Sequence, residues 1–202
     1  AVLTFRSLVS IMRDKMLTNA RIFQSLSMAL VMGLLYLRLD RSQSSVQNRI
    51  GVLFFALNFS IMGSLFGSLS TFVTAERPVF MRERSAKAYR VSSYYLGKVF
   101  AETPSNFLFP PLMGVIMYWM VGLNPKASAF FTFIFLVIVI SMTAQAMGLL
   151  IASIVPSLEV AQAITPIVLT LFMLFGGFYL NVKNIPDWLN WVYWMSVYHF
   201  GF

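Results

Sequence analysis

The chain has 202 residues, of which 58% are apolar and only 11% are charged, and its net charge is +8. A soluble domain is usually about 45–50% apolar and about 25% charged, so this composition excludes an ordinary soluble domain and indicates a membrane protein. The absence of cysteine excludes disulfides and thiolate metal sites, and the basic residues form no extended patch of the kind that binds nucleic acid.

The first segment, residues 1–20, has the pattern of an amphipathic helix. Apolar residues recur there at helical spacing, while the charged residues mostly face elsewhere; the apolar positions are Phe5, Leu8, Val9, Met12 and Met16. The pattern predicts a connecting helix on the cytoplasmic membrane surface. The alternative is an ordinary helix of a soluble domain outside this chain.

Five stretches without a charged residue follow, at 22–37, 50–75, 103–125, 127–158 and 160–182. A membrane-spanning helix needs about 20 apolar residues, so the last four are long enough. The first becomes adequate if Arg21 and Arg38 extend outward from its ends. A β-barrel is excluded because residues 130–140 are apolar on every face. The predicted fold is an all-α, polytopic transmembrane helix bundle with five spans.

The second span, about 50–74, carries small residues at four-residue intervals. Such rows let helix backbones approach closely in lipid. The rows contain Ser60, Gly63, Ser64, Gly67, Ser68 and Thr71. Packing within one subunit and a dimer face are both open interpretations.

Nine charged residues then lie between positions 76 and 104, the densest charge in the chain. If the N-terminus is cytoplasmic, ten of the fifteen basic residues lie on the cytoplasmic side and five outside. This bias favours that orientation under the positive-inside rule. The loop at 76–100 is therefore predicted to be cytoplasmic.

The remaining spans have their own features. The third, about 103–122, contains Pro104, Pro110 and Pro111, which would kink it. The fourth, about 128–154, repeats the small-residue spacing at Ala144, Gly148 and Ala152, and the fifth covers about 160–180. Residues 182–202 carry Trp188, Trp191 and Trp194 at three-residue steps, which predicts an external helix lying in the membrane interface.

Catalytic chemistry is not visible in the sequence. His199 is the only histidine, no phosphate-binding loop is present, and no carboxylate lies centrally in a predicted span. Glu102 and Glu159 fall at span ends and are interpreted as interface residues. We therefore expect no enzyme activity, no cofactor and no metal in this chain, and no ionisable residue that would couple transport to an ion.

Several motifs together resemble the membrane domain of the G subfamily of ABC transporters, the white/brown and multidrug-resistance half-transporters. The matching segments cover nearly the whole chain. They are Gln47-Asn48-Arg49-x-Gly51-Val52-Leu53-Phe54-Phe55, Glu76-Arg77-x-x-Phe80-x-x-Glu83, Tyr89 to Lys98, Gly122 to Ala127, and Gly177-Phe178-Tyr179-Leu180-Asn181.

The resemblance implies a six-span domain that follows an ATP-binding domain in the same polypeptide and pairs with a second, identical or different, half-transporter. Residues 1–202 would be the transmembrane domain, without the sixth span and without the domain that binds ATP and Mg. The implied function is ATP-driven export of lipids, sterols or hydrophobic xenobiotics. A non-transporting membrane assembly subunit is the alternative, and a passive channel is disfavoured because few polar residues occur in the spans.

The resemblance also assigns residues to roles. The coupling helix that docks on the ATP-binding domain would contain Glu76, Arg77, Phe80, Arg82, Glu83, Arg84, Tyr89 and Arg90; the alternative is that these charges only keep the loop inside. The substrate cavity would be lined by Asn58, Phe59, Met62, Pro166, Leu169, Thr170 and Met173, although Phe59 and Met62 are also explained by packing. Phe178 and Tyr179 would form an upper gate, and Ser60, Gly63, Ser64 and Gly67 a packing or dimer face.

Overall fold

The computed structural model describes residues 2–13, 15–37, 45–87 and 89–176, together with Trp191, Trp194, Ser196 and Tyr198. The described segments are helices joined by short turns. In chain order they are α1 (Val2–Arg13), α2 (Lys15–Leu35), α3 (Ser45–Thr71), the π-helix η1 (Phe72–Glu76), α4 (Arg77–Ser85), α5 (Val91–Val121), α6 (Ala127–Ile154) and α7 (Leu158–Leu174).

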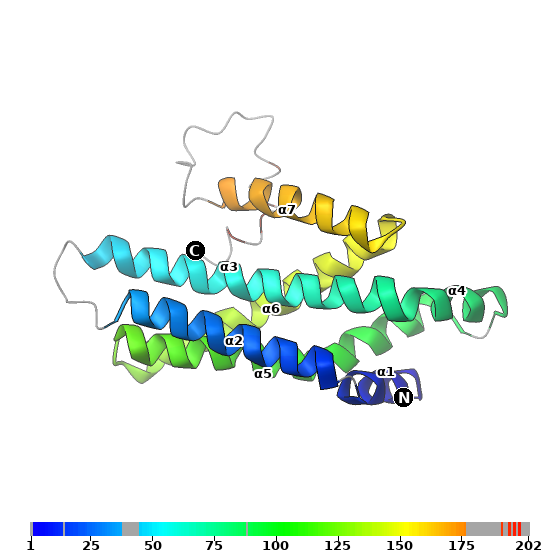
Figure 1. Cartoon of the computed structure of the whole chain (residues 1–202), viewed down its shortest axis with the longest axis horizontal. Coiled ribbons are helices and arrows are strands. Elements are labelled where there is room, and N and C mark those ends of the chain that lie inside the picture. The colour runs from blue at the N-terminus through cyan, green and yellow to red at the C-terminus, as the bar shows by residue number, and fades with distance from the viewer. Residues whose placement is uncertain are drawn as a thin grey trace.

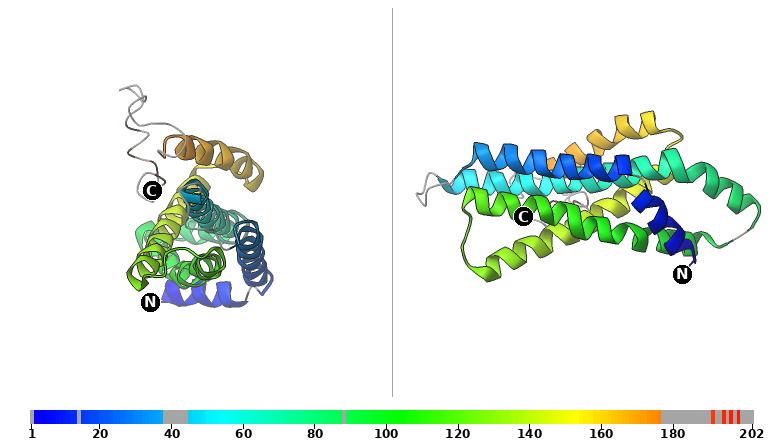
Figure 2. Two further views of the ribbon diagram at one scale, coloured as in Figure 1. Left: turned by 90° about the vertical axis from the view of Figure 1, so that its left-hand side faces the viewer. Right: turned by 60° about the horizontal axis from the view of Figure 1, so that its bottom comes forward.

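The long helices form an elongated bundle (Figure 1). The most extensive contacts join α3 to α6 and α2 to α5, and α5 also packs on α6. α4 continues the line of α3 past the end of the bundle, α1 lies at that same end against α5, and α7 covers one side (Figures 1 and 2). The end of the bundle that carries α1 and α4 is thus built from segments far apart in the sequence.

The prediction of an all-α membrane bundle is confirmed. Two helical stretches, Val46–Thr74 and Ala127–Ile154, are long and apolar enough to cross a membrane, and α7 is a shorter apolar helix. Large apolar side chains also point outward, as on a surface that faces lipid; examples are Phe107, Trp119, Phe131, Phe135 and Ile154. The number of five spans stays a prediction.

Close packing of α3 on α6 forms the centre of the bundle. A Cβ atom placed on Gly148 would lie 2.6 Å from the carbonyl oxygen of Leu65 and 3.2 Å from its Cα. Ala144 and Ala152, one turn away on either side, are fully buried. The small-residue row of the fourth span therefore serves packing within this chain, because it lets the α6 backbone lie directly on α3.

α5 differs from the helix expected at about 103–122. It begins at Val91, so the polar residues before position 103 belong to the same helix as the apolar ones, and it continues through Pro104, Pro110 and Pro111. It ends at Gly122, whose φ of 71° is the left-handed conformation that favours glycine at a helix C-terminus. Consequently Lys98 and Glu102 lie inside a 31-residue helix.

Candidate functional site at the end that carries α1 and α4

An ion pair joins the first helix to α4. The Arg6 guanidinium donates two hydrogen bonds to the Glu83 carboxylate, of 2.5 Å to Oε1 and 3.1 Å to Oε2. The Tyr89 hydroxyl donates a third, of 2.6 Å, to Glu83 Oε2. A two-pronged contact of this kind fixes orientation as well as distance. The N-terminal segment is therefore held in a defined position on α4.

These contacts shift the pKa values of Arg6, Glu83 and Tyr89. Hydrogen bonding to Arg6, and then to Tyr89, lowers the pKa of Glu83 from its ordinary value of 4.5. Burial, followed by the hydrogen bond to Glu83, raises the pKa of Tyr89 from 10.0, and the Glu83 contact raises the pKa of Arg6. Arg6 is half-exposed, so the pair contributes about 1 kcal/mol or less.

We expect the contact between α1 and α4 to weaken at both extremes of pH. Because the pKa of Glu83 is lowered, its contribution is present above pH 4.5 and lost as the pH falls through the lowered value. Because the pKa of Tyr89 is raised, its contribution is present below pH 10 and lost as the pH rises through the raised value. Spin labels placed on α1 and α4 of this cysteine-free chain would report the distance; Glu83→Gln should abolish the acid transition.

Aromatic rings pack beneath the ion pair and attach α4 to α5. The ring of Phe80 lies 4.7 Å from that of Tyr94, measured between centroids, and Tyr89 stacks on Tyr94 at 5.8 Å. Phe72 contacts both Phe80 and Tyr94. Such ring pairs contribute about 0.5–1.5 kcal/mol each beyond the area they bury. The Phe80 ring thus attaches α4 to the bundle, while Arg82 and Arg84 of the same helix are exposed.

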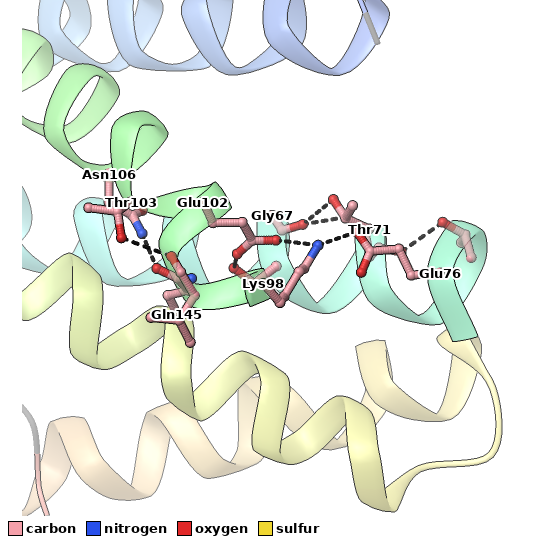
Figure 3. A network of polar contacts seen from close by, with 12 residues as sticks. Gly67, Thr71, Glu76, Lys98, Glu102, Thr103, Asn106 and Gln145 are labelled. Atoms are coloured by element: carbon pink, nitrogen blue, oxygen red, sulfur yellow. Dashed lines mark hydrogen bonds and ion pairs between the residues drawn. The ribbon is translucent and has the colours of Figure 1, made fainter. Parts of the chain in front are cut away.

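A buried ionic cluster lies deeper, where α3, η1 and α5 meet (Figure 3). Lys98 Nζ lies 2.5 Å from Glu76 Oε1 and 2.7 Å from Glu102 Oε1. Ser68 donates a 2.5 Å hydrogen bond to Glu102, and Tyr94 donates one of 2.5 Å to Glu76. The side chains of Lys98 and Glu102 are only 1% and 3% exposed. Charges buried this completely are stable only when they are paired and hydrogen-bonded, as these are.

The interpretation of Glu102 as an interface residue at the end of a span is wrong. The side chain lies inside the bundle because α5 starts twelve residues earlier than the predicted span and carries Glu102 against Ser68 of α3. Arg21 also departs from the expectation that it extends outward. Its Nη2 atom lies 2.7 Å from where a Cβ of Gly67 would be, so the guanidinium packs against α3.

The π-helical turn η1 ends at Glu76, which pairs with Lys98. A π-helical turn inserts one residue into a helix and rotates everything that follows it. Here the turn covers Phe72–Glu76, directly before α4. It therefore changes the rotational register of α4 relative to α3 at Glu76, the residue that pairs with Lys98, while the helix itself continues.

Arg77 connects α4 to the end of α6. Its Nη1 atom donates hydrogen bonds to the backbone carbonyl oxygens of Val155 and, at 3.0 Å, Pro156. These two residues form the turn between α6 and α7. α4 is therefore hydrogen-bonded to the turn that precedes α7.

The structure brings together five of the eight predicted coupling residues, namely Glu76, Arg77, Phe80, Glu83 and Tyr89. The other three, Arg82, Arg84 and Arg90, are exposed at the surface. Sequence reasoning did not assign Arg6, Tyr94, Lys98 or Glu102 to this site. One available signal was the spacing of Tyr94, Lys98 and Glu102, which puts them on one helical face.

The predicted cavity residues lie on α3 and α7, which contact each other. Leu169 is buried in the core, and Phe59, Met62 and Met173 pack against the core. Pro166 and Thr170 are exposed, and Asn58 accepts a 2.6 Å hydrogen bond from Tyr198. Their role in substrate binding stays a prediction. The gate residues Phe178 and Tyr179, and most of the predicted external helix at 182–202, lie outside the described residues.

The small residues of the second span face the interior of this chain. Ser60, Gly63 and Ser64 line a small cavity together with residues of α2 and α5, and Gly67 lies against Arg21. Further along α5, Asn106 donates a buried hydrogen bond to Gln145 of α6 (Figure 3). These contacts describe packing within one subunit; a dimer face on the same residues stays a prediction.

The family match and the relatives of this chain all indicate an ABC transporter. The ABC-2 type transporter family matches residues 1–202. The chain is 33% identical over 197 residues to protein white of Ceratitis capitata, covering 98% of the chain and 29% of the relative. It is 36% identical over 190 residues to ABC transporter G family member 7 of Arabidopsis thaliana, covering 94% and 26%.

A mammalian relative shows the same relationship. The chain is 32% identical over 198 residues to the mouse broad substrate specificity ATP-binding cassette transporter ABCG2, covering 98% of the chain and 30% of that protein. The chain thus spans less than a third of the length of these relatives. It belongs to the ABC-2 type transporter family and is an integral membrane domain, and the relatives that it matches include G family members of the ABC transporters.

Proposed function

We propose that this domain carries out ATP-driven export of lipids, sterols or hydrophobic xenobiotics, with its N-terminus in the cytoplasm. Transport across a membrane follows from the family. ATP would be bound and hydrolysed by a separate domain of the same polypeptide, and a second half-transporter would complete the pathway. The mouse relative is described as a transporter of broad substrate specificity, which supports a class of substrates over a single compound.

The observation that carries the proposal is that α4 contacts three other elements of the domain. It is held by Arg6 of α1 on one side, by the Phe80–Tyr94 contact beneath, and by Arg77 on the turn before α7. A push on α4 from an ATP-binding domain would therefore move α1, α5 and the start of α7 together, as a rigid body. Arg82 is exposed on α4, where it is free to form charge-assisted contacts with that domain.

Substrate would bind between α3 and α7 of the two subunits. Asn58, Phe59 and Met62 of α3 and Pro166, Leu169, Thr170 and Met173 of α7 are the proposed lining. Methionine and aromatic side chains adapt to flat, apolar molecules. The exposed face of α7, with Pro166 and Thr170, supports this placement because it is not covered by other described helices of the chain.

In the complete half-transporter, Glu83→Gln is expected to reduce substrate-stimulated ATPase several-fold while dimerisation and surface expression are unchanged. The variant removes the charge that holds α1 on α4. Glu159→Gln, on an exposed carboxylate of α7, is the matched control and should retain stimulation. Arg6→Glu should reproduce the loss, and the reversed pair Arg6→Glu with Glu83→Arg should recover much of it. Normal stimulation in both single variants would refute the coupling role.

The assembly-subunit alternative depended on a dimer face at Gly63 and Gly67. Gly67 is occupied by Arg21 of the same chain, which leaves less of this face for a partner. We therefore favour the transporter.

A further inference from the structure

A second cavity, distinct from the proposed substrate region, lies between α4, the first turns of α5 and the last turns of α6. Its volume is about 730 Å³, which is within the range of sites that hold a whole small ligand. The inner wall is apolar and aromatic, with Phe72, Phe80, Met147 and Leu149. Its rim carries apolar side chains that are themselves exposed; Met81, Val91, Tyr95 and Leu150 are between 45% and 62% exposed.

Three cationic side chains line the same cavity, and they differ in whether a carboxylate neutralises their charge. Lys98 is already paired with Glu76 and Glu102. Within the described ranges Arg77 bonds only to neutral backbone carbonyl oxygens, and Arg84 is exposed on α4. Among the described residues, no carboxylate forms an ion pair with Arg77 or Arg84. The cavity therefore combines an apolar interior with two arginines whose charge is not neutralised within the described part of the chain.

This combination selects the chemistry of the ligand. A free phosphate or nucleotide would pair with the arginines but leave the apolar wall exposed to water. An uncharged apolar molecule would cover the wall but leave the arginine charges unpaired. A membrane lipid with an anionic headgroup satisfies both, because guanidinium groups bind phosphate and the groove accepts an acyl chain. Leu150 on the rim is exposed, so the cavity is open toward the outer surface of α6, which gives the acyl chain a route from the bilayer.

We propose that this cavity binds an anionic glycerophospholipid, with its phosphate at Arg77 and Arg84 and an acyl chain along Phe72, Met147 and Leu150. The bound lipid would fill the space between α4 and α6. It would hold α4 on the bundle in addition to the aromatic contacts. This binding does not depend on which substrate the protein transports.

The test uses the complete protein reconstituted in nanodiscs of phosphatidylcholine with a minor fraction of phosphatidylserine. Native mass spectrometry should show phosphatidylserine retained in preference to phosphatidylcholine. Arg84→Gln should weaken this retention at least five-fold. Arg82→Gln removes the same charge from the same helix but does not line the cavity, so it should change retention less than two-fold. Equal losses in the two variants, or no loss in Arg84→Gln, would overturn the proposal.

A second experiment tests the acyl chain and the location in the unmodified protein. Phosphatidylserine with a photoreactive group in its acyl chain should label peptides of α4 and of α6 around Met147. Excess glycerol phosphate should not prevent the labelling. Ala146→Phe, which fills the cavity and leaves both arginines in place, should reduce it. Labelling confined to other helices, or complete competition by glycerol phosphate, would contradict a lipid site here.

Discussion

Replacing Lys98 by methionine is expected to destabilise the domain by about 3–5 kcal/mol, the usual cost of removing one partner from a buried ion pair. Lys98 is the cation that contacts both Glu76 and Glu102, and its side chain is 1% exposed. Without it, two carboxylates remain close together in the bundle, where solvation by water does not compensate them. The loss should appear as a lower midpoint in thermal or SDS unfolding of the purified protein.

Two further variants separate the charge effect from a packing effect. Lys98→Arg keeps the cation and should cost clearly less than Lys98→Met. The double variant Lys98→Met with Glu102→Gln removes one of the two carboxylate charges that the single variant leaves behind, so it should be more stable than Lys98→Met alone. If Lys98→Met were as stable as the unmodified protein, the ion pairs of Lys98 would contribute nothing to the stability of the contact between η1 and α5.

Gly148→Ala is expected to destabilise the contact between α3 and α6, although alanine is the better helix former. The propensity gain is up to about 1 kcal/mol. Against it, the new Cβ would lie 2.6 Å from the carbonyl oxygen of Leu65, and overpacking of this kind costs about 1–3 kcal/mol. Since the obstructing atoms are backbone, no rotamer change relieves them, and we expect a net loss. Gly148→Leu should prevent native packing altogether.

Gly63→Ala is the matched control on α3. A Cβ at Gly63 would meet nothing within 4 Å, so this variant should be neutral or slightly more stable. Both variants are compared by the unfolding midpoint in one detergent. Equal midpoints for Gly148→Ala and Gly63→Ala would show that α3 and α6 separate more readily than their contact indicates.

The charge clusters show where sequence reasoning stopped. The sequence identified the loop at 76–100 as the region of densest charge, and motifs such as Glu76-Arg77-x-x-Phe80 indicated the family. It did not separate charges that face water from those buried between helices. Arg6 and Glu83 are 77 positions apart, and Glu76 and Lys98 are 22 apart, so neither pair leaves a local pattern.

Hydropathy by itself determined that this protein is a bundle of membrane helices, because the cost of placing a residue in lipid is local and adds along the chain. The tertiary structure alone decided that Glu102 is buried, that Arg21 packs on Gly67, and that Gly148 touches the backbone of Leu65. These depend on which helices meet and in what register. A charged residue near the end of a span is stable at the membrane surface or inside the bundle, and only a partner on another helix determines which.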